Sequence, residues 1–577
     1  MDVVMKRWRY LLWGLLALPL PVLAQSETAG LEAAVEEILT LTGETDIESL
    51  DVSLAERFAH YRAHPLRIND LSRSRLLSSG LLTPYQVATL LDYRSSQGDI
   101  LSAGELELID GFGPVQTKAL TPFVSFASDR LPGAEHQESR FGGEVTLRGG
   151  WMGDSYNTGL RLNLNRTDRW EIGLAARTQT GETLSWRPSG RSAFLAYYGR
   201  RHLGQLIIGD FNARFGQGLA LWNGFGLSGV ATPAAFIRRP TGLSVSRSYA
   251  GSGWRGLAMD WNFGRWTVTA FSALHGPSGG NVAWYGRYGQ VSATGFVRSE
   301  DLVRRMSSDT TDVSSYARAA LDARFCLRGV DLFAEVARDF PGGSVAAVGG
   351  LIFPVGDGRR MALLVRHYPA AYSGRDAGAV RSSTKVSDEE GAAIAWENRS
   401  QSVSLDAAWH PSKQQGQFKL VTNGTLLTRG PWTWKYRFTG RYRSAEPRLR
   451  ADFRTDLAWT KGEWTLDGRT EVCYSRKAAF LAYAEAGRKS GNHFVWLRGT
   501  AFRVDDWESR IYAYERNAPG TFSVPSYYGR GYSLAVYAGR KGKHWSVWLQ
   551  GSLLAYPWME KQKPGKAGLR LQVTGTW

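Results

Sequence analysis

Apolar and polar side chains alternate along most of the chain, from about residue 141 to the C-terminus. The clearest segments are 432–443, 449–459 and 464–472, where Trp, Tyr, Phe and Leu alternate with Arg, Lys, Asp and Thr. In a β-strand these two sets point to opposite faces. Each segment has the length of about ten residues that a tilted strand needs to cross a membrane. The pattern therefore predicts transmembrane strands.

These strands are expected to close into an antiparallel all-β transmembrane barrel. The sequence has no fixed repeat of the kind that a solenoid or propeller needs. A soluble sandwich would not need so many strands with aromatic residues near their ends. At roughly 18 residues per strand and its loops, residues 141–577 allow about 24 strands. We predict about 22, in a range of 18–26, because part of the chain is expected to fold inside. The terminal aromatic residue, Trp577, resembles the assembly signal that the barrel assembly machinery reads.

The first 25 residues have the pattern of a signal peptide. Lys6, Arg7 and Arg9 precede an apolar stretch at 10–20, and Val22-Leu23-Ala24 offers a cleavage site. A retained anchor helix is the alternative reading. The mature protein is therefore expected to be exported.

Residues 26–127 change to a helical period. Leu31, Val35, Ile38 and Leu39 share one helical face. Residues 128–140, with Pro132 and Gly133, have the composition of a linker. We therefore predict a signal peptide at 1–25, a small all-α domain at 26–127, a linker at 128–140 and the barrel at 141–577.

The charge differs sharply between the two parts. The whole chain carries +17, but residues 26–130 hold 8 Lys and Arg against 16 Asp and Glu, a charge of −8. Residues 26–56 contain nine carboxylates and no Lys or Arg. Residues 131–577 consequently carry +23. An acidic helical domain thus precedes a basic barrel.

A tandem helix-hairpin-helix pattern occupies about 66–126. The residues that carry it are Asn69, Leu76, Pro84, Tyr93-Arg94, Gly98, Ser102, Glu105-Leu106, Gly111-Phe112-Gly113-Pro114 and Pro122-Phe123. This stretch resembles the module of the competence protein ComEA and related DNA-binding proteins. The resemblance implies a phosphate site at Gly111, Phe112 and Gly113, where oriented amides face the anion, with Lys118 as a further contact.

The match departs from the family in two places. Leu81-Leu82-Thr83 stands where the first hairpin of the family has glycines, and Asp110 adjoins the second hairpin. Because phosphate neutralisation dominates DNA affinity, a domain of charge −8 is expected to bind DNA weakly. A structural or protein-binding use of the module is favoured over DNA contact.

Two motifs of the strand region extend the resemblance to the whole chain. They are 209–225, which begins Gly-Asp-Phe-Asn-Ala-Arg-Phe-Gly-Gln-Gly, and 512–516 with 527–531. With the helical module they resemble a Bacteroidota-type family of outer-membrane barrels that carry a helix-hairpin-helix domain and have no established activity. Gly216-Gln217-Gly218 is read either as a turn with positive φ or as part of a polar network in the lumen.

Candidate lumen residues follow from the strand alternation and these motifs. They are Asp210, Arg214, Gln217, Lys435, Arg437, Arg441, Arg450, Arg454, Glu515 and Arg516. The basic residues of 435–454 crowd two neighbouring strands, so we expect an acidic segment or an anionic solute opposite them. Trp432, Trp434 and Tyr436 are expected to face lipid.

No feature of the sequence favours an enzyme. The nine His have no metal-ligand spacing, and no nucleophile elbow or Walker loop appears, so no catalytic residue, metal or cofactor is expected. We predict a non-enzymatic pore, translocation component or scaffold of the Gram-negative outer membrane, with its helical domain in the periplasm. The first alternative function is DNA uptake through the helix-hairpin-helix module, and the second alternative is that of an outer-membrane hydrolase. Expected partners are lipid, lipopolysaccharide and a periplasmic protein, with DNA less favoured.

Overall fold

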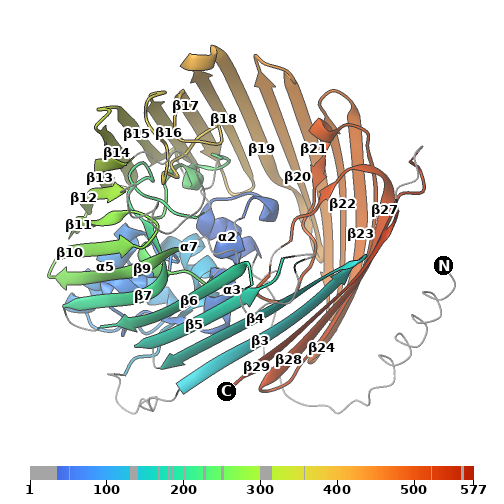
Figure 1. Ribbon diagram of the computed structural model, residues 1–577, viewed down its shortest axis with the longest axis horizontal. Helices are drawn as coiled ribbons and strands as arrows, with labels where there is room; N and C mark the ends of the chain where they lie inside the picture. The colour runs from blue at the N-terminus through green and yellow to red at the C-terminus, as the bar shows by residue number, and fades with distance from the viewer. Residues whose placement is uncertain are drawn as a thin grey trace.

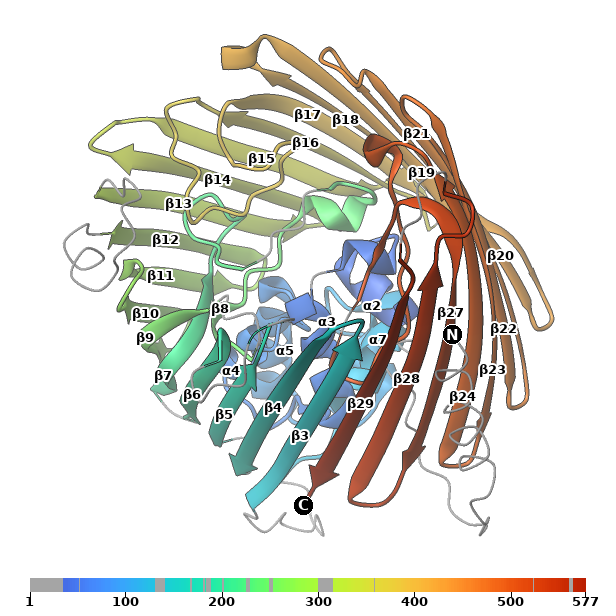
Figure 2. The same ribbon diagram turned by 45° about the vertical axis from the view of Figure 1, so that its right-hand side comes forward.

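A closed wall of antiparallel strands forms most of the molecule (Figures 1 and 2). The computed structural model describes residues 35–577 except 51, 130–140, 167–168, 180–181, 183–187, 200–201, 225–228, 248–252, 299–314, 357, 522 and 560–563. The signal-peptide and most linker predictions lie outside the described residues.

The wall has 24 strands within the described part of the chain. This count lies in the predicted range of 18–26, two above the expected 22. The strands are β3 (Phe141–Met152), β4 (Ser155–Arg166), β5 (Trp170–Arg177), β6 (Gly190–Tyr198), β7 (Leu203–Arg214), β9 (Trp254–Phe263), β10 (Trp266–Ala273), β11 (Ser278–Gly286), β12 (Gly289–Arg298), β13 (Tyr316–Leu327), β14 (Val330–Phe340), β15 (Val345–Pro354), β16 (Arg360–Tyr368), β17 (Glu389–Glu397), β18 (Gln401–His410), β19 (Gln415–Arg429), β20 (Trp432–Arg443), β21 (Leu449–Lys461), β22 (Trp464–Tyr474), β23 (Ala478–Ser490), β24 (His493–Val504), β27 (Gly529–Lys541), β28 (Trp545–Ala555) and β29 (Lys566–Thr576).

The wall closes because β29 pairs with β3, for example Val573 with Leu147. Along β14 the outward Leu332 and Val336 are exposed, whereas the inward Phe333 and Glu335 are buried. Closure leaves no strand edge unpaired, and an apolar outer face suits lipid. The alternation of the sequence therefore produces a transmembrane barrel.

Strand connections differ between the two ends of the barrel. The end that holds the start of β3 and the end of β29 has connections of only two to five residues. The opposite end has the long ones, among them 215–253, 369–388 and 505–528.

Long connections fold back into the barrel. Residues 215–253 include η4 (Pro233–Phe236) and β8 (Gly242–Val245), which pairs with the end of β7. Residues 505–528 include η6 (Trp507–Ser509), β25 (Ile511–Tyr512) and β26 (Ser526–Tyr527). Gly209, with φ of 108°, marks the point where β7 leaves β6, because the β6–β7 pairing ends there. A short turn, η5 (Pro411–Lys413), joins β18 to β19.

The N-terminal region is helical. It comprises α2 (Val35–Thr42), η2 (Ile47–Ser49), α3 (Val52–Ala63), α4 (Arg73–Ser78), α5 (Pro84–Ser96), α6 (Ala103–Glu107), α7 (Gly113–Leu120) and η3 (Thr121–Phe123), with a two-stranded parallel sheet of β1 (Leu66–Arg67) and β2 (Val124–Ser125). Ser72, Thr83 and Ser102 cap α4, α5 and α6, as their hydroxyls can accept from the free amides of the first turn. Among the described helices, none has the length and apolar character that a membrane-spanning helix requires.

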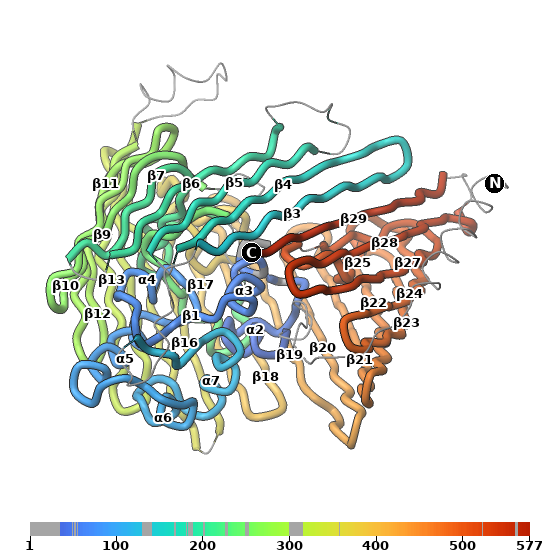
Figure 3. Tube along the Cα trace, turned by 90° about the horizontal axis from the view of Figure 1, so that it is seen from below, coloured from blue at the N-terminus to red at the C-terminus, as the bar shows by residue number. Residues whose placement is uncertain are grey.

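These helices lie within the ring of strands rather than outside the barrel (Figures 1 and 2). Arg73 of α4 donates to the carbonyl of Gly264 at 2.7 Å, and Ala283 and Tyr285 of β11 join the apolar core of the helices. α5, α6 and α7 lie toward one end (Figure 3). The helical region, for which the sequence predicted a periplasmic domain, thus packs against the inner wall. Its acidic residues pair with basic residues of that wall.

Candidate functional site: the contact between the helical region and the inner wall

The contact is built from carboxylates of the helical region and cations of the wall. Arg454 of β21 approaches Asp46 at 3.0 Å and Glu48 at 3.2 Å. Arg437 of β20 also pairs with Asp46, and Arg469 of β22 pairs with Glu48 at 2.5 Å. We call Asp46, Glu48, Arg437, Arg454 and Arg469 the latch. Two carboxylates of one segment thus hold three strands of the wall.

Local structure explains why the two carboxylates face the wall. Gly43, with φ of 75°, ends α2 and lets the chain turn. Asp46 then caps η2, with its carboxylate accepting from the Glu48 amide at 3.3 Å. The Glu48 carboxylate also accepts a hydrogen bond, at 3.0 Å, from the amide of Tyr514 in the 505–528 loop. The latch therefore joins the helical region, the wall and an inserted loop.

The latch is largely buried, unlike a surface ion pair. The side chain of Asp46 is 7% exposed and that of Arg454 is 14% exposed. Burial alone would raise the pKa of Asp46, but Arg454, Arg437 and Arg469 lower it from 3.8 to about 2. Asp46 is therefore ionised at neutral pH.

Further ion pairs join the helical region to the wall. Lys435 pairs with Glu36, and Arg161 of β4 pairs with Glu56 of α3 at 2.9 Å. One further pair has its cation on the helical region and its carboxylate on the wall, because Arg75 of α4 lies 3.9 Å from Glu171 of β5. The acidic stretch of the sequence and the basic strands thus meet in the lumen.

A second polar cluster holds the inserted loops. Glu335 of β14 accepts from the amides of Leu219 and Ala220 at 3.0 and 2.8 Å. Arg318 of β13, whose side chain is 0% exposed, pairs with Asp339 at 2.6 Å and donates to the Arg375 carbonyl at 2.9 Å. These contacts attach both the 215–253 and the 369–388 loops to the wall.

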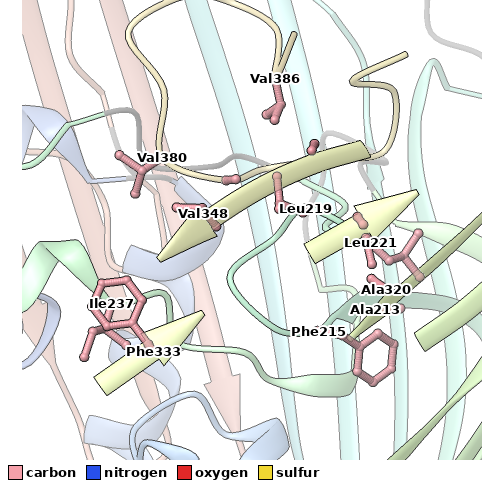
Figure 4. Close-up of a cluster of buried hydrophobic side chains, with 14 of the residues drawn as sticks. Ala213, Phe215, Leu219, Leu221, Ile237, Ala320, Phe333, Val348, Val380 and Val386 are labelled. Carbon is pink, nitrogen blue, oxygen red and sulfur yellow. The ribbon is translucent and has the colours of Figure 1, made fainter. Parts of the chain in front are cut away.

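Apolar side chains complete this attachment. Figure 4 shows one buried cluster that contains Phe215, Leu219 and Leu221 of one loop and Val380 and Val386 of the other. Phe333 and Val348 of the wall belong to the same buried cluster. The loops are therefore packed as a core.

The motif at 209–225 forms the start of the first loop. Asp210 pairs with Arg255 at 2.8 Å and accepts from the amide of Ala193. Arg214 donates to the Asn223 carbonyl, and Gln217 accepts from the Arg238 amide. Gly216 has φ of 57°, and a Cβ there would lie 2.8 Å from Glu335. Gly216 thus has the positive φ of a turn, and the close approach of Glu335 leaves no room for a side chain at this position.

The remaining predicted lumen residues make other contacts. Glu515 accepts from Tyr527, and Arg516 pairs with Glu485. Arg450 pairs with Asp452 at 2.9 Å. Arg441 is half-buried on β20. Glu515 and Arg516 thus have partners within the 505–528 loop and on β23.

The predicted phosphate residues lie on α7 and the turn before it. The carbonyl of Gly111 accepts from Gln86 at 2.8 Å, and Phe112 is buried. Gly113 begins α7, and Lys118 is exposed. Packing against α5 therefore occupies part of this hairpin. Among the described residues, no group of three His, Cys, Asp or Glu could hold a metal ion.

Replacing Gly111 by alanine is expected to loosen this hairpin. Its φ is 89°, and a Cβ would lie 2.8 Å from the Tyr85 ring. Gly113→Ala is the matched control, because Gly113 has φ of 63° but nothing within 4 Å of an added Cβ. Hydrogen exchange of α5–α7 amides should show a loss of about 1–3 kcal/mol for Gly111→Ala and a smaller loss for Gly113→Ala. Equal losses would contradict the packing argument.

Sequence reasoning missed Asp46, Glu48 and Arg469 of the latch. Glu36, Asp46, Glu48 and Glu56 belong to the stretch of nine carboxylates without a basic residue, which is the signal that could have identified them. Arg318 and Glu335 gave no comparable signal, because single charges on inward positions are common in barrel strands.

Comparison with known proteins adds only fold likeness. No known protein family model matches the chain. No curated protein matches it either. Solved barrels are similar in structure. The P pilus usher PapC translocation pore has 10% identity and a TM-score of 0.33, covering 75% of this chain and 99% of its own. OpdQ of Pseudomonas aeruginosa has 8% identity and a TM-score of 0.28, covering 76% and 98%. OccK3 (OpdO) of the same organism has 9% identity and a TM-score of 0.29, covering 76% and 96%. At these TM-scores we conclude nothing further from the likeness.

Proposed function

We propose that this protein is a gated channel of the outer membrane, closed by its own N-terminal helical region. The observation that carries the proposal is the latch, in which Asp46 and Glu48 bind three arginines of the inner wall. A wall of 24 strands encloses a lumen wide enough to need a plug. A plug held by ion pairs can be released without unfolding the wall.

The two ends of the barrel support an orientation for the channel. Outer-membrane barrels have short turns on the periplasmic side and longer loops outside. Here the short connections lie at the same end of the barrel as Phe141, where the first strand begins, and Thr576, where the last strand ends. We therefore infer that the helical region enters from the periplasm and that the loops at 215–253, 369–388 and 505–528 enter from the cell surface.

A disulfide between α4 and β7 tests whether the helical region must move. An added Cβ at Gly204 would lie 2.9 Å from the Cβ of Ser74, close enough to bridge after a small shift. The Ser74→Cys/Gly204→Cys protein is expected to show no current in planar bilayers under voltage or moderate urea, and to regain current after reduction. Each single cysteine variant is the control for mispairing with Cys326 or Cys473. Unchanged current through the oxidised double variant would show that the helical region is not the gate.

DNA uptake has less support as a second function. The hairpin at Gly111 is packed against α5, and the exposed residues near it in the sequence include Glu107 and Asp110 as well as Lys118. Carboxylates near a phosphate site oppose binding. A labelled duplex titrated against the full-length protein at 150 mM salt should therefore bind no tighter than about 10⁻⁴ M, and submicromolar binding that requires Lys118 would reverse this ranking.

A further inference from the structure

Three cations form a row across neighbouring strands of the inner wall. Lys419 of β19 is directly opposite Arg441 of β20, and Arg441 is directly opposite Arg450 of β21. Their side chains share the inward face, because Phe418 and Tyr442 point outward and are exposed. Like charges directly opposite one another on neighbouring strands are destabilising. A row of this kind therefore needs an anion.

The next row toward the periplasmic end shows how such a need is met. Arg437 and Arg454 are also directly opposite each other, and Asp46 pairs with both. A carboxylate of the helical region thus occupies the lower row. The two rows are four residues apart, which is about 13 Å along a strand.

Among the described residues, no carboxylate forms an ion pair with Lys419 or Arg441 of the upper row, although Asp452 pairs with Arg450. Arg450 is bound by Asp452 and by the carbonyls of Glu508 and Arg510. Asp406 is opposite Lys419, but it pairs with Arg366 at 2.7 Å. Within the described residues, neither Lys419 nor Arg441 has a hydrogen bond or ion pair. Both side chains are half-buried rather than sealed from the lumen.

We propose that Lys419 and Arg441, next to Arg450, form a binding site for an anionic solute that carries carboxylate or phosphate groups. Because β20 runs from the short-turn end at Trp432 to the long-loop end at Arg443, a solute from outside meets this row before it meets the latch. A chain of several anionic groups that binds here reaches the lower row and competes with Asp46 for Arg437 and Arg454. The competition, but not the site, rests on the proposed gating function.

Calorimetric titration of the full-length protein in detergent tests the site. Citrate and tripolyphosphate are the probes, and the tighter one identifies carboxylate or phosphate as the preferred group. Arg441→Gln is expected to weaken binding about ten-fold, the value of one charge-assisted hydrogen bond. Arg429→Gln, which removes an exposed charge from the other end of β19, should leave binding unchanged. Absence of binding, or binding that Arg441→Gln does not weaken, would overturn the site.

A second titration tests the competition. Asp46→Asn removes the ion pair of Arg437 in the lower row, so a polyglutamate of about ten residues should bind about ten-fold more tightly, whereas citrate should bind as before. An unchanged affinity for polyglutamate would overturn the competition. Because this measurement is of binding and not of current, it separates failure of the site from failure of the gate. Heat-modifiable electrophoretic mobility of each variant reports that the barrel has folded.

Discussion

Replacing Asp46 by asparagine and Glu48 by glutamine together is expected to open the channel. The double change neutralises the helical-region partners of Arg437, Arg454 and Arg469. Arg454 and Arg469 keep Asp456 of the wall at 2.6 Å, whereas Arg437 loses the carboxylate of its ion pair. Removal of one side of a buried ion pair costs about 3–5 kcal/mol. A loss of about 3 kcal/mol shifts the closed-to-open equilibrium by about 100-fold. Single-channel recording in planar bilayers should therefore show open events that the unaltered protein rarely shows.

The matched control for this prediction is Glu36→Gln. Glu36 pairs with Lys435, but its side chain is 75% exposed and that of Lys435 is 43% exposed. Exposed pairs contribute about 0–1 kcal/mol, so this variant should remain closed. Equal conductance in the two variants would show that the latch does not hold the helical region in place.

The latch also predicts how the closed state depends on pH. Burial would raise the pKa of Asp46, but the three arginines lower it from 3.8 to about 2. The stabilisation is therefore fully present above pH 3.8 and is lost as the pH falls through about 2. Its size is about 2 kcal/mol. Conductance is expected to be the same from pH 5 to pH 8 and to rise only in strong acid.

Replacing Arg318 by methionine is expected to detach the inserted loops. Arg318 is fully buried, pairs with Asp339, and donates to Ala220 and Arg375 carbonyls. The change leaves Asp339 buried without its cation, which costs about 3–5 kcal/mol. Protease added to vesicles that display the long-loop end should cleave within 215–253 and 369–388 of this variant, and should spare the unaltered protein.

Two further variants identify the cause of this effect. Arg338→Met removes an arginine from the exposed outward face of β14 and should not increase cleavage. Arg318→Met combined with Asp339→Leu removes both charges, and apolar replacement of a whole buried pair is often tolerated. The double variant should therefore be cleaved less than Arg318→Met alone. If the double variant is cleaved at least as fast as Arg318→Met alone, the lost hydrogen bonds to the loops matter more than the unpaired charge.

The strands of the wall follow from the sequence. The alternation at 432–443 predicts β20 to its last residue, and those at 449–459 and 464–472 predict most of β21 and β22. Alternation identifies a strand and its two faces because side chains of a strand point in turn to opposite sides. A closed barrel follows because no strand edge is tolerated in lipid.

What fills the lumen was decided by the tertiary structure alone. The sequence displayed an acidic segment at 26–56 and basic strands near 435–454, and it predicted an acidic partner for those strands without identifying it. The pairing of Asp46 with Arg454 joins residues 408 positions apart, and no local period records such a contact. Hydrophobic alternation indicates the face of the strand on which a residue lies. The charged group opposite that residue depends on how the barrel closes around the helical region. The latch and the row of Lys419, Arg441 and Arg450 therefore become visible only when the barrel is assembled around its N-terminal helices.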